Sequence, residues 1–322
     1  MDIVLSAAAP YLTGWRFTAL ILSIVLAAAG YLAFSLWGGW EEVIQAFVMI
    51  GWQGTLIALL LSLVNYGLRF VRWQCYLAQL GHSVPYLPSL RIYLSGFALT
   101  TTPGKAGEVF RGVLLKQRDI PFPSSFAAFI SERLSDLVAI ILLTLVGLSQ
   151  YPQAQGIVFA GVAGVVAVLA CVSSQTLLTK IHTWADKRAD RISRLILKVS
   201  HILSQARVCH SPGILMLATI ISVVSWGAEA LAFYWVLGWL GADISFSFAV
   251  FVYALSMLAG ALSFLPGGLG GAEAVMISLL VFKGMPMPVA IAATVFIRLA
   301  TLWFAVAIGL VALYRSRKGE ML

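Results

Sequence analysis

Long apolar runs divide the chain into segments that are long enough to cross a membrane. A bilayer core needs about 20 mostly apolar helical residues, and six segments approach or exceed that length. The sequence therefore predicts an all-α polytopic membrane protein with about six full transmembrane helices. The predicted spans are 17–37, 50–73, 124–148, 155–173, 212–237 and 287–313.

Two further apolar stretches, 87–117 and 246–283, are broken near the middle by a Pro-Gly motif. Each half has about 15 residues, or roughly 22 Å of helix, which is shorter than a bilayer core of about 30 Å. Proline lacks an N–H group and glycine accepts left-handed torsions, so the chain can reverse at these points. We therefore predict two re-entrant helical hairpins.

The two broken stretches carry the same motif twice. The sequence Pro103-Gly-Lys-Ala-Gly-Glu108 returns, altered, as Pro266-Gly-Gly-Leu-Gly-Gly-Ala-Glu273, so that Glu108 matches Glu273 at an offset of 165 residues. Seven of eighteen residues are identical between 120–137 and 285–302. The whole chain, 1–322, is therefore predicted to be one transmembrane domain made of two repeats. Its parts are repeat 1 at about 50–173, a basic linker at about 174–211 and repeat 2 at about 212–315.

Charge orients this arrangement in the membrane. Charged residues make up only 11% of the chain, against about 25% in a soluble domain, and mean hydropathy is +0.95. The linker 174–211 is rich in Lys and Arg, whereas 38–49 has Glu41 and Glu42 and no basic residue. By the positive-inside rule the linker and both termini are predicted to be cytoplasmic. Three crossings separate matching points of the repeats, which predicts an inverted repeat, a transporter architecture.

The tips of the two hairpins carry the first set of candidate functional residues. Glu108 and Glu273 fall in the first turn of each returning half-helix, where a carboxylate either caps the helix or takes a proton or an arginine during a transport cycle. The neighbouring glycines leave backbone N–H groups open near a positive helix end, which suits a phosphate. The first tip also has Lys105, which has no basic counterpart in the second.

Arginines inside predicted spans form the second set. Arg133 matches Arg298, and an arginine at that depth faces the protein interior or a watery cavity. Each arginine is expected either to bind a lipid phosphate or to form an ion pair, Arg133 with Asp136 and Arg298 with Glu273. A third possibility is that each exchanges its carboxylate partner for the phosphate. We expect these two arginines to meet Glu108 and Glu273 in one polar network. The candidate translocation residues are Pro103, Gly104, Lys105, Gly107, Glu108, Arg111, Glu132, Arg133, Asp136, Glu229, Pro266, Gly267, Gly268, Gly270, Glu273 and Arg298.

Glu229 is isolated in the span 212–237, and it either pairs with Arg298 or carries a coupling proton. No histidine lies in the apolar runs, and the cysteines Cys75, Cys171 and Cys209 have no pairing or metal-ligand spacing. No Walker A motif is present, so we expect no ATP motor. The residues thus give no sign of a catalytic centre, metal, cofactor or nucleic-acid site.

These motifs resemble the flippase-like integral membrane family, which includes the transmembrane region of lysylphosphatidylglycerol synthases (the multiple peptide resistance factor). The matching residues are Thr102-Pro-Gly-Lys-Ala-Gly-Glu-Val-Phe-Arg111, Glu132-Arg133-Leu-Ser-Asp136, Leu265-Pro-Gly-Gly-Leu-Gly-Gly-Ala-Glu273 and Arg298. The resemblance implies an inner-membrane protein that moves a lipid headgroup between leaflets. The chain ends at Leu322 with no soluble aminoacyltransferase domain, so aminoacyl transfer is not expected.

We therefore predict a lipid translocase for an anionic or phosphate-bearing lipid, or lipid-linked headgroup, in the inner (cytoplasmic) membrane. Two alternatives stay open, an intramembrane enzyme acting on a lipid phosphate and a non-transporting partner of a lipid-modifying enzyme. The expected partners are the substrate lipid and anionic headgroups at the basic linker. A homo-oligomer, or a complex with a lipid-synthesising enzyme, also stays open.

Overall fold

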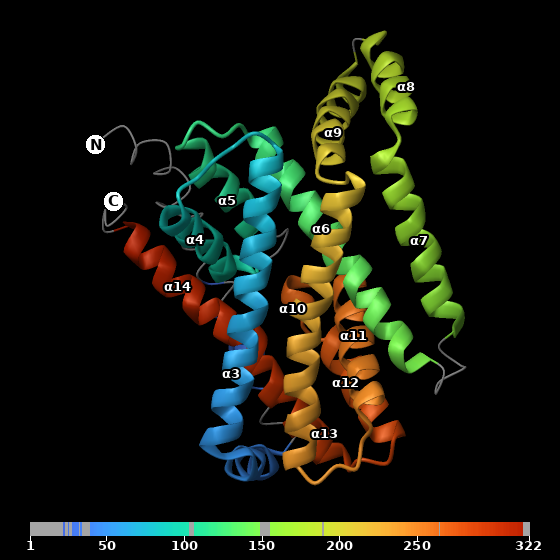
Figure 1. Cartoon of the computed structure of the whole chain (residues 1–322). Helices are drawn as coiled ribbons and strands as arrows, with labels where there is room; N and C mark the ends of the chain where they lie inside the picture. The colour runs from blue at the N-terminus through green and yellow to red at the C-terminus, as the bar shows by residue number, and fades with distance from the viewer. Residues whose placement is uncertain are drawn as a thin grey trace.

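The described part of the chain is helical throughout, as predicted. A computed structural model places side chains and backbone over most of the sequence, and within these residues every regular element is a helix (Figure 1). The described residues are 22, 25, 28–31, 33, 39–102, 106–148, 155–188, 190–263 and 265–317.

Two long helices form the centre of the bundle. Helix α3 (Trp40–Gln79) and helix α10 (Pro212–Trp239) pack side by side and run in opposite directions (Figure 1). Their contact is close, because a Cβ atom added to Gly54 would lie 2.8 Å from the Trp239 ring. The prediction that 38–49 is an outer loop is wrong in one respect. Residues from Trp40 onward are already helical, and α3 bends at Gly51, whose φ of +64° is left-handed.

Helix is interrupted at both predicted places: at residues 100–102, directly before the first Pro-Gly motif (which lies outside the described residues), and at the second motif itself. In the first stretch, α4 (Tyr86–Ser95) continues into the 3₁₀ turn η1 (Gly96–Leu99), and helix resumes in α5 (Ala106–Lys116). In the second, α11 (Phe246–Leu262) is followed by the 3₁₀ turn η4 (Pro266–Gly268) and then by α12 (Gly271–Phe282). These halves have 10 to 17 residues, which is too short to cross a bilayer core alone.

A long helical segment follows each broken stretch. Helix α6 (Phe122–Leu148) follows the first. After the second come α13 (Met287–Arg298), a π-helical turn η5 (Leu299–Trp303) and α14 (Phe304–Arg317). The order long helix, two short helices, long helix therefore occurs twice.

The two halves exchange contacts. Helix α6 of the first half packs on α11 of the second, and α14 of the second half packs on α4 and η1 of the first. Glycines permit both approaches. A Cβ atom on Gly147 would lie 2.5 Å from the Phe251 Cβ, and one on Gly309 would lie 2.1 Å from the Ala98 nitrogen. Small residues at such crossings are typical of helices that associate within membranes.

Among the described residues, three helical segments are both long and apolar enough to cross a membrane: Trp40–Gln79, Pro212–Trp239 and Met287–Arg315. Helix α7 (Gln155–Ser173) is a fourth if it is counted with α8 (Gln175–Asp186), to which it is joined at a bend of 67°. Helix α6 has 27 residues but carries three charged side chains near its middle, Glu132, Arg133 and Asp136. Of the predicted span 17–37, only residues 22, 25, 28–31 and 33 are described, and these are helical.

The basic linker forms a helical hairpin beyond the bundle. Helix α9 (Arg191–Val208) packs against α8, and the pair extends past the ends of α3 and α10 (Figure 1). Side-chain caps begin both helices: Ser174 accepts a hydrogen bond from the Leu177 amide, and Asp190 accepts one from the Ser193 amide. The Ser193 hydroxyl and amide together lower the pKa of Asp190, so this cap stays ionised at neutral pH.

Candidate functional site

The second Pro-Gly tip holds a buried ion pair. Arg298 on α13 donates from Nε to Glu273 Oε1 at 2.6 Å, and from Nη2 to the Gly267 carbonyl oxygen at 2.8 Å. The Gly270 amide donates to the other carboxylate oxygen, Glu273 Oε2, at 2.7 Å. Both charged side chains are about 5% exposed. We call these four residues the Glu273 cluster. Glu273 thus caps α12 and pairs with Arg298 at the same time, which confirms the predicted pair.

Glycine is required at this tip by conformation and by space. Gly267, Gly268 and Gly270 all have positive φ, at +63°, +67° and +86°. A Cβ atom on Gly267 would lie 3.3 Å from the Thr101 Cγ2 atom, which belongs to the first tip. The two broken stretches therefore meet tip to tip inside the bundle.

The first tip is described only in part. Pro103, Gly104, Lys105 and the side chain of Glu108 lie outside the described residues. Gly107 is described and packs against η1, because a Cβ atom there would lie 2.3 Å from the Gly96 carbonyl oxygen.

Arg111 and Glu132 form a second buried ion pair, between α5 and α6. Arg111 Nη2 donates to Glu132 Oε2 at 2.9 Å, and the two side chains are 8% and 0% exposed. The Arg111 guanidinium also lies over the Trp73 and Tyr93 rings, 5.7 and 5.1 Å from their centroids. The candidate residues Arg111 and Glu132 are thus brought together, and they join α5 firmly to α6.

Three arginines converge on a single carboxylate, Asp136 of α6. Arg69 and Arg72 of α3 donate at 3.0 and 2.8 Å, and Arg133, one turn earlier on α6, lies at 3.0 Å. The indole N–H of Trp226 on α10 also donates a hydrogen bond to Asp136, at 3.1 Å. We call these five residues the Asp136 cluster. It joins three helices, and it confirms the predicted Arg133–Asp136 pair.

The Asp136 cluster carries an excess of positive charge. Three guanidinium groups and one carboxylate give a formal charge of +2. The Arg72 side chain is fully buried and also donates to the Ser222 hydroxyl, yet its Nε and Nη2 have no hydrogen-bond partner among the described residues. The Nε atoms of Arg69 and Arg133 are likewise buried and unpaired. Arg133 is the most open of the three, with a side chain that is 35% exposed.

Arg69 and Arg72 were not among the site residues predicted from the sequence. Their spacing was the available signal. Arginines at positions i and i+3 of one apolar helix point to the same face, and here that face meets α6.

The expected single polar network is divided in the structure. Arg133 belongs to the Asp136 cluster and Arg298 to the Glu273 cluster, and among the described residues no ion pair joins the two. Glu229 lies on α10 one turn after Trp226, and its Oε2 accepts a 2.6 Å hydrogen bond from the Tyr253 hydroxyl. The suggested ion pair between Glu229 and Arg298 is absent from the described contacts, because Arg298 is held by Glu273.

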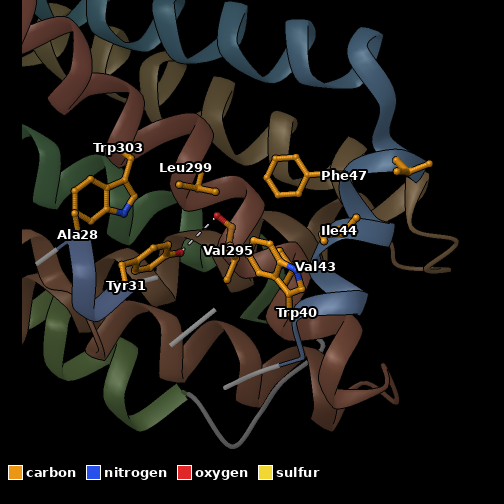
Figure 2. A pocket seen from close by; sticks show the side chains of 10 residues that line it. Ala28, Tyr31, Trp40, Val43, Ile44, Phe47, Val295, Leu299 and Trp303 are labelled. Atoms are coloured by element: carbon orange, nitrogen blue, oxygen red, sulfur yellow. Dashed lines mark hydrogen bonds between the residues drawn. The ribbon is translucent and has the colours of Figure 1, made fainter. Parts of the chain in front are cut away.

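An apolar cavity of about 590 Å³ lies beside Val295 of α13 (Figure 2). Tyr31, Phe47, Val295, Leu299 and Trp303 are among the residues that line it. Val295 and Leu299 lie one turn apart on the helix that carries Arg298. The Tyr31 hydroxyl donates to the Val295 carbonyl oxygen at 3.5 Å.

The described residues contain no group of three or more His, Cys, Asp or Glu side chains that could hold a metal ion. The three cysteines are free thiols, as the sequence predicted.

Comparison with known proteins identifies the family. The family model for the lysylphosphatidylglycerol synthase TM region matches residues 20–309. A UPF0104 membrane protein of Methanothermobacter thermautotrophicus is 27% identical over 91% of both chains. Another, from Pyrococcus horikoshii, is 21% identical over 92% of this chain and 97% of its own. The chain is therefore a multi-pass membrane protein that belongs to the lysylphosphatidylglycerol synthase transmembrane-region family, whose membrane domain is linked to the flipping of lipids.

Proposed function

We propose that this protein is a lipid translocase that moves an anionic, phosphate-bearing lipid headgroup between the leaflets of the inner membrane. The observation that carries the proposal is the Asp136 cluster. Buried positive charge inside a membrane protein is costly and marks a pathway for substrates or ions. The planar guanidinium forks of this cluster suit a phosphate.

The spare donors of the cluster support this choice of ligand. Within the described part of the chain, Arg72 has two buried N–H-bearing atoms without a hydrogen-bond partner, and Arg69 and Arg133 have one each. Buried polar groups are almost always hydrogen-bonded, so a set of unpaired, positively charged donors favours a negatively charged acceptor. Arg133 is partly exposed, so it is the first of these arginines that an entering headgroup would meet.

We further propose that the two halves form an inverted repeat of re-entrant hairpins, with both termini on the cytoplasmic side. The opposite directions of α3 and α10 support this, and so do the exchanged contacts of α6 and α14 (Figure 1). The two broken stretches begin near opposite ends of the bundle in that view. Hairpins that open to opposite sides and meet tip to tip provide two gates for alternating access without ATP.

Cysteine labelling tests this orientation. Lys116 is the last residue of α5 and Lys283 directly follows α12, and both are exposed. In a background without the native cysteines, Lys116→Cys should react with an impermeant maleimide only from the cytoplasmic side, and Lys283→Cys only from the outside. Labelling of both from the same side would contradict the inverted repeat.

The transport proposal is tested by lipid exchange in proteoliposomes. We expect the wild type to move fluorescent phosphatidylglycerol between leaflets, and Arg133→Ala to slow this about 10- to 100-fold, since a charged hydrogen bond contributes roughly 1.5–3 kcal/mol. Arg298→Ala should also slow exchange, because it releases the Glu273 tip. The matched control is Arg194→Ala, which removes an exposed arginine from α9.

Three outcomes would count against translocation. Folded variants that exchange lipid as fast as the wild type would assign the arginines a structural role only. Conversion of the lipid by the pure protein would favour an intramembrane enzyme. A wild type that neither moves nor alters lipid would favour a non-transporting partner of a lipid-modifying enzyme.

We also propose that the α8–α9 hairpin lies on anionic headgroups at the cytoplasmic surface. The exposed side of this hairpin includes apolar residues: Trp184 is 47% exposed and Ile192 is 69% exposed. The lysines and arginines of the linker lie beside them. A helix with an apolar face and basic flanks binds the membrane interface in this way.

A further inference from the structure

Glu229 is a buried carboxyl group that forms no ion pair with any described residue. The residue is 5% exposed, and its one hydrogen bond comes from the neutral Tyr253 hydroxyl. Glu132, Asp136 and Glu273, the other buried carboxyl groups described in the bundle, are each bound by at least one arginine. In an apolar interior an ionised carboxylate is costly unless nearby positive charge compensates it, whereas the protonated form needs no such charge.

The position of Glu229 connects it with both ion clusters. It lies one turn after Trp226, which binds Asp136, and Tyr253 brings it to α11, which also carries Met257 beside Arg298. The charged groups that act on it electrostatically are Arg69 from α3, Asp136 from α6 and Arg298 from α13. Tyr66 of α3 is its other titratable neighbour, in addition to Tyr253.

Both arginines that act on Glu229 are already engaged with other carboxylates. Arg69 binds Asp136, and Arg298 binds Glu273. The protonation of Glu229 is therefore sensitive to any change in the anions that these arginines bind. An anionic headgroup among them adds negative charge near Glu229, and like-charge repulsion then favours its protonated form. Departure of the headgroup restores positive charge and favours the carboxylate.

We propose that Glu229 is a proton-coupling site, which takes up one proton when the anionic headgroup binds and releases it when the headgroup leaves. In the release step the carboxyl O–H bond breaks, the proton passes to water, and the carboxylate is compensated by Arg69 and Arg298. Lipid and proton then move together in the same direction. This inference rests on the proposed lipid transport and names its driving ion.

A pH gradient across proteoliposomes tests the coupling. One proton per monoanionic lipid predicts that each pH unit changes the steady-state leaflet ratio of fluorescent phosphatidylglycerol up to about tenfold, because one pH unit is a factor of ten in proton activity. The lipid should accumulate in the leaflet on the alkaline side. Glu229→Gln fixes a neutral side chain of the same shape, so the lipid exchange that this variant carries out should no longer respond to the gradient.

Tyr253→Phe is the matched control. It removes the hydrogen bond to Glu229 and keeps the carboxyl group, so the response to the gradient should persist with a shifted pH midpoint. A wild type that exchanges lipid and ignores the gradient would overturn the coupling and leave the translocase intact. A Glu229→Gln variant that still follows the gradient would overturn it equally.

Infrared difference spectroscopy gives a second readout, which needs no transport. Adding phosphatidylglycerol to the wild type in zwitterionic nanodiscs should produce a carboxylic-acid C=O band that Glu229→Gln lacks. Absence of this band from the wild type would overturn proton uptake at Glu229. If the wild type moves no lipid under any condition, the proposed transport fails, whatever the infrared result.

Discussion

The buried pair of Glu273 and Arg298 yields the sharpest prediction about stability. The two side chains are 4% and 5% exposed and lie 2.6 Å apart. Removing one partner of such a pair costs about 3–5 kcal/mol, because the remaining charge is left buried without compensation. Removing both costs less than the sum of the two single changes.

The geometry refines the two single effects. Arg298→Met leaves a carboxylate with one remaining donor, the Gly270 amide. Glu273→Gln leaves a guanidinium that still donates to the Gly267 carbonyl oxygen, while the new amide oxygen can accept from Gly270. We therefore expect Arg298→Met to be the more destabilising change. The double variant should recover roughly 1–3 kcal/mol relative to additivity, the usual coupling of contacting residues.

Reversible unfolding in mixed detergent–SDS micelles measures these free energies. The matched control is the exposed arginine Arg194, whose change to Met should alter the free energy of unfolding by less than about 0.5 kcal/mol. If the two single changes and the double change add within about 0.3 kcal/mol, the charges do not interact in the folded protein, and the reasoning about this pair is refuted.

Further predictions concern the packing of the tips and the basic hairpin. Gly267→Ala should destabilise the fold by at least about 1 kcal/mol, since its φ is +63° and the tips touch there, whereas Gly164→Ala, in open space on α7, should be neutral or stabilising. Thermal unfolding in detergent compares the two. Gly309→Val should loosen α14 from Ala98 and increase hydrogen exchange in η1. Trp184→Ser should weaken labelling of the α8–α9 hairpin by lipid-soluble probes, without altering bundle stability.

Much of the fold could be predicted because it depends on local signals. Apolar length predicted the long helices, and the paired Pro-Gly motifs predicted both breaks, since proline and glycine end helices for reasons within the backbone itself. The start of α3 was misjudged. The segment 38–49, with Glu41 and Glu42 and no basic residue, predicted an outer loop, yet residues from Trp40 onward are helical and the helix bends at Gly51.

The site could be predicted only in part, because ion pairing depends on which helix faces meet. The repeat marked Arg133 and Arg298, and short-range spacing suggested Asp136 for the first. The role of Arg72 could not be deduced in the same way, since its partners Asp136 and Ser222 come from helices 64 and 150 residues away in sequence. The split of the expected network into two clusters likewise depends on how α3 of the first half packs against α10 of the second.

The most direct test of the central claim is a cryo-electron microscopy structure of the protein in nanodiscs that contain phosphatidylglycerol. We predict density for a lipid phosphate within about 3 Å of the unpaired Nε and Nη2 atoms of Arg72, with Arg69 or Arg133 as a second ligand. The acyl chains should extend into the bilayer. Ordered lipid found only around the outer perimeter, with the three arginines closed on Asp136, would contradict the claim that this cluster binds the transported headgroup.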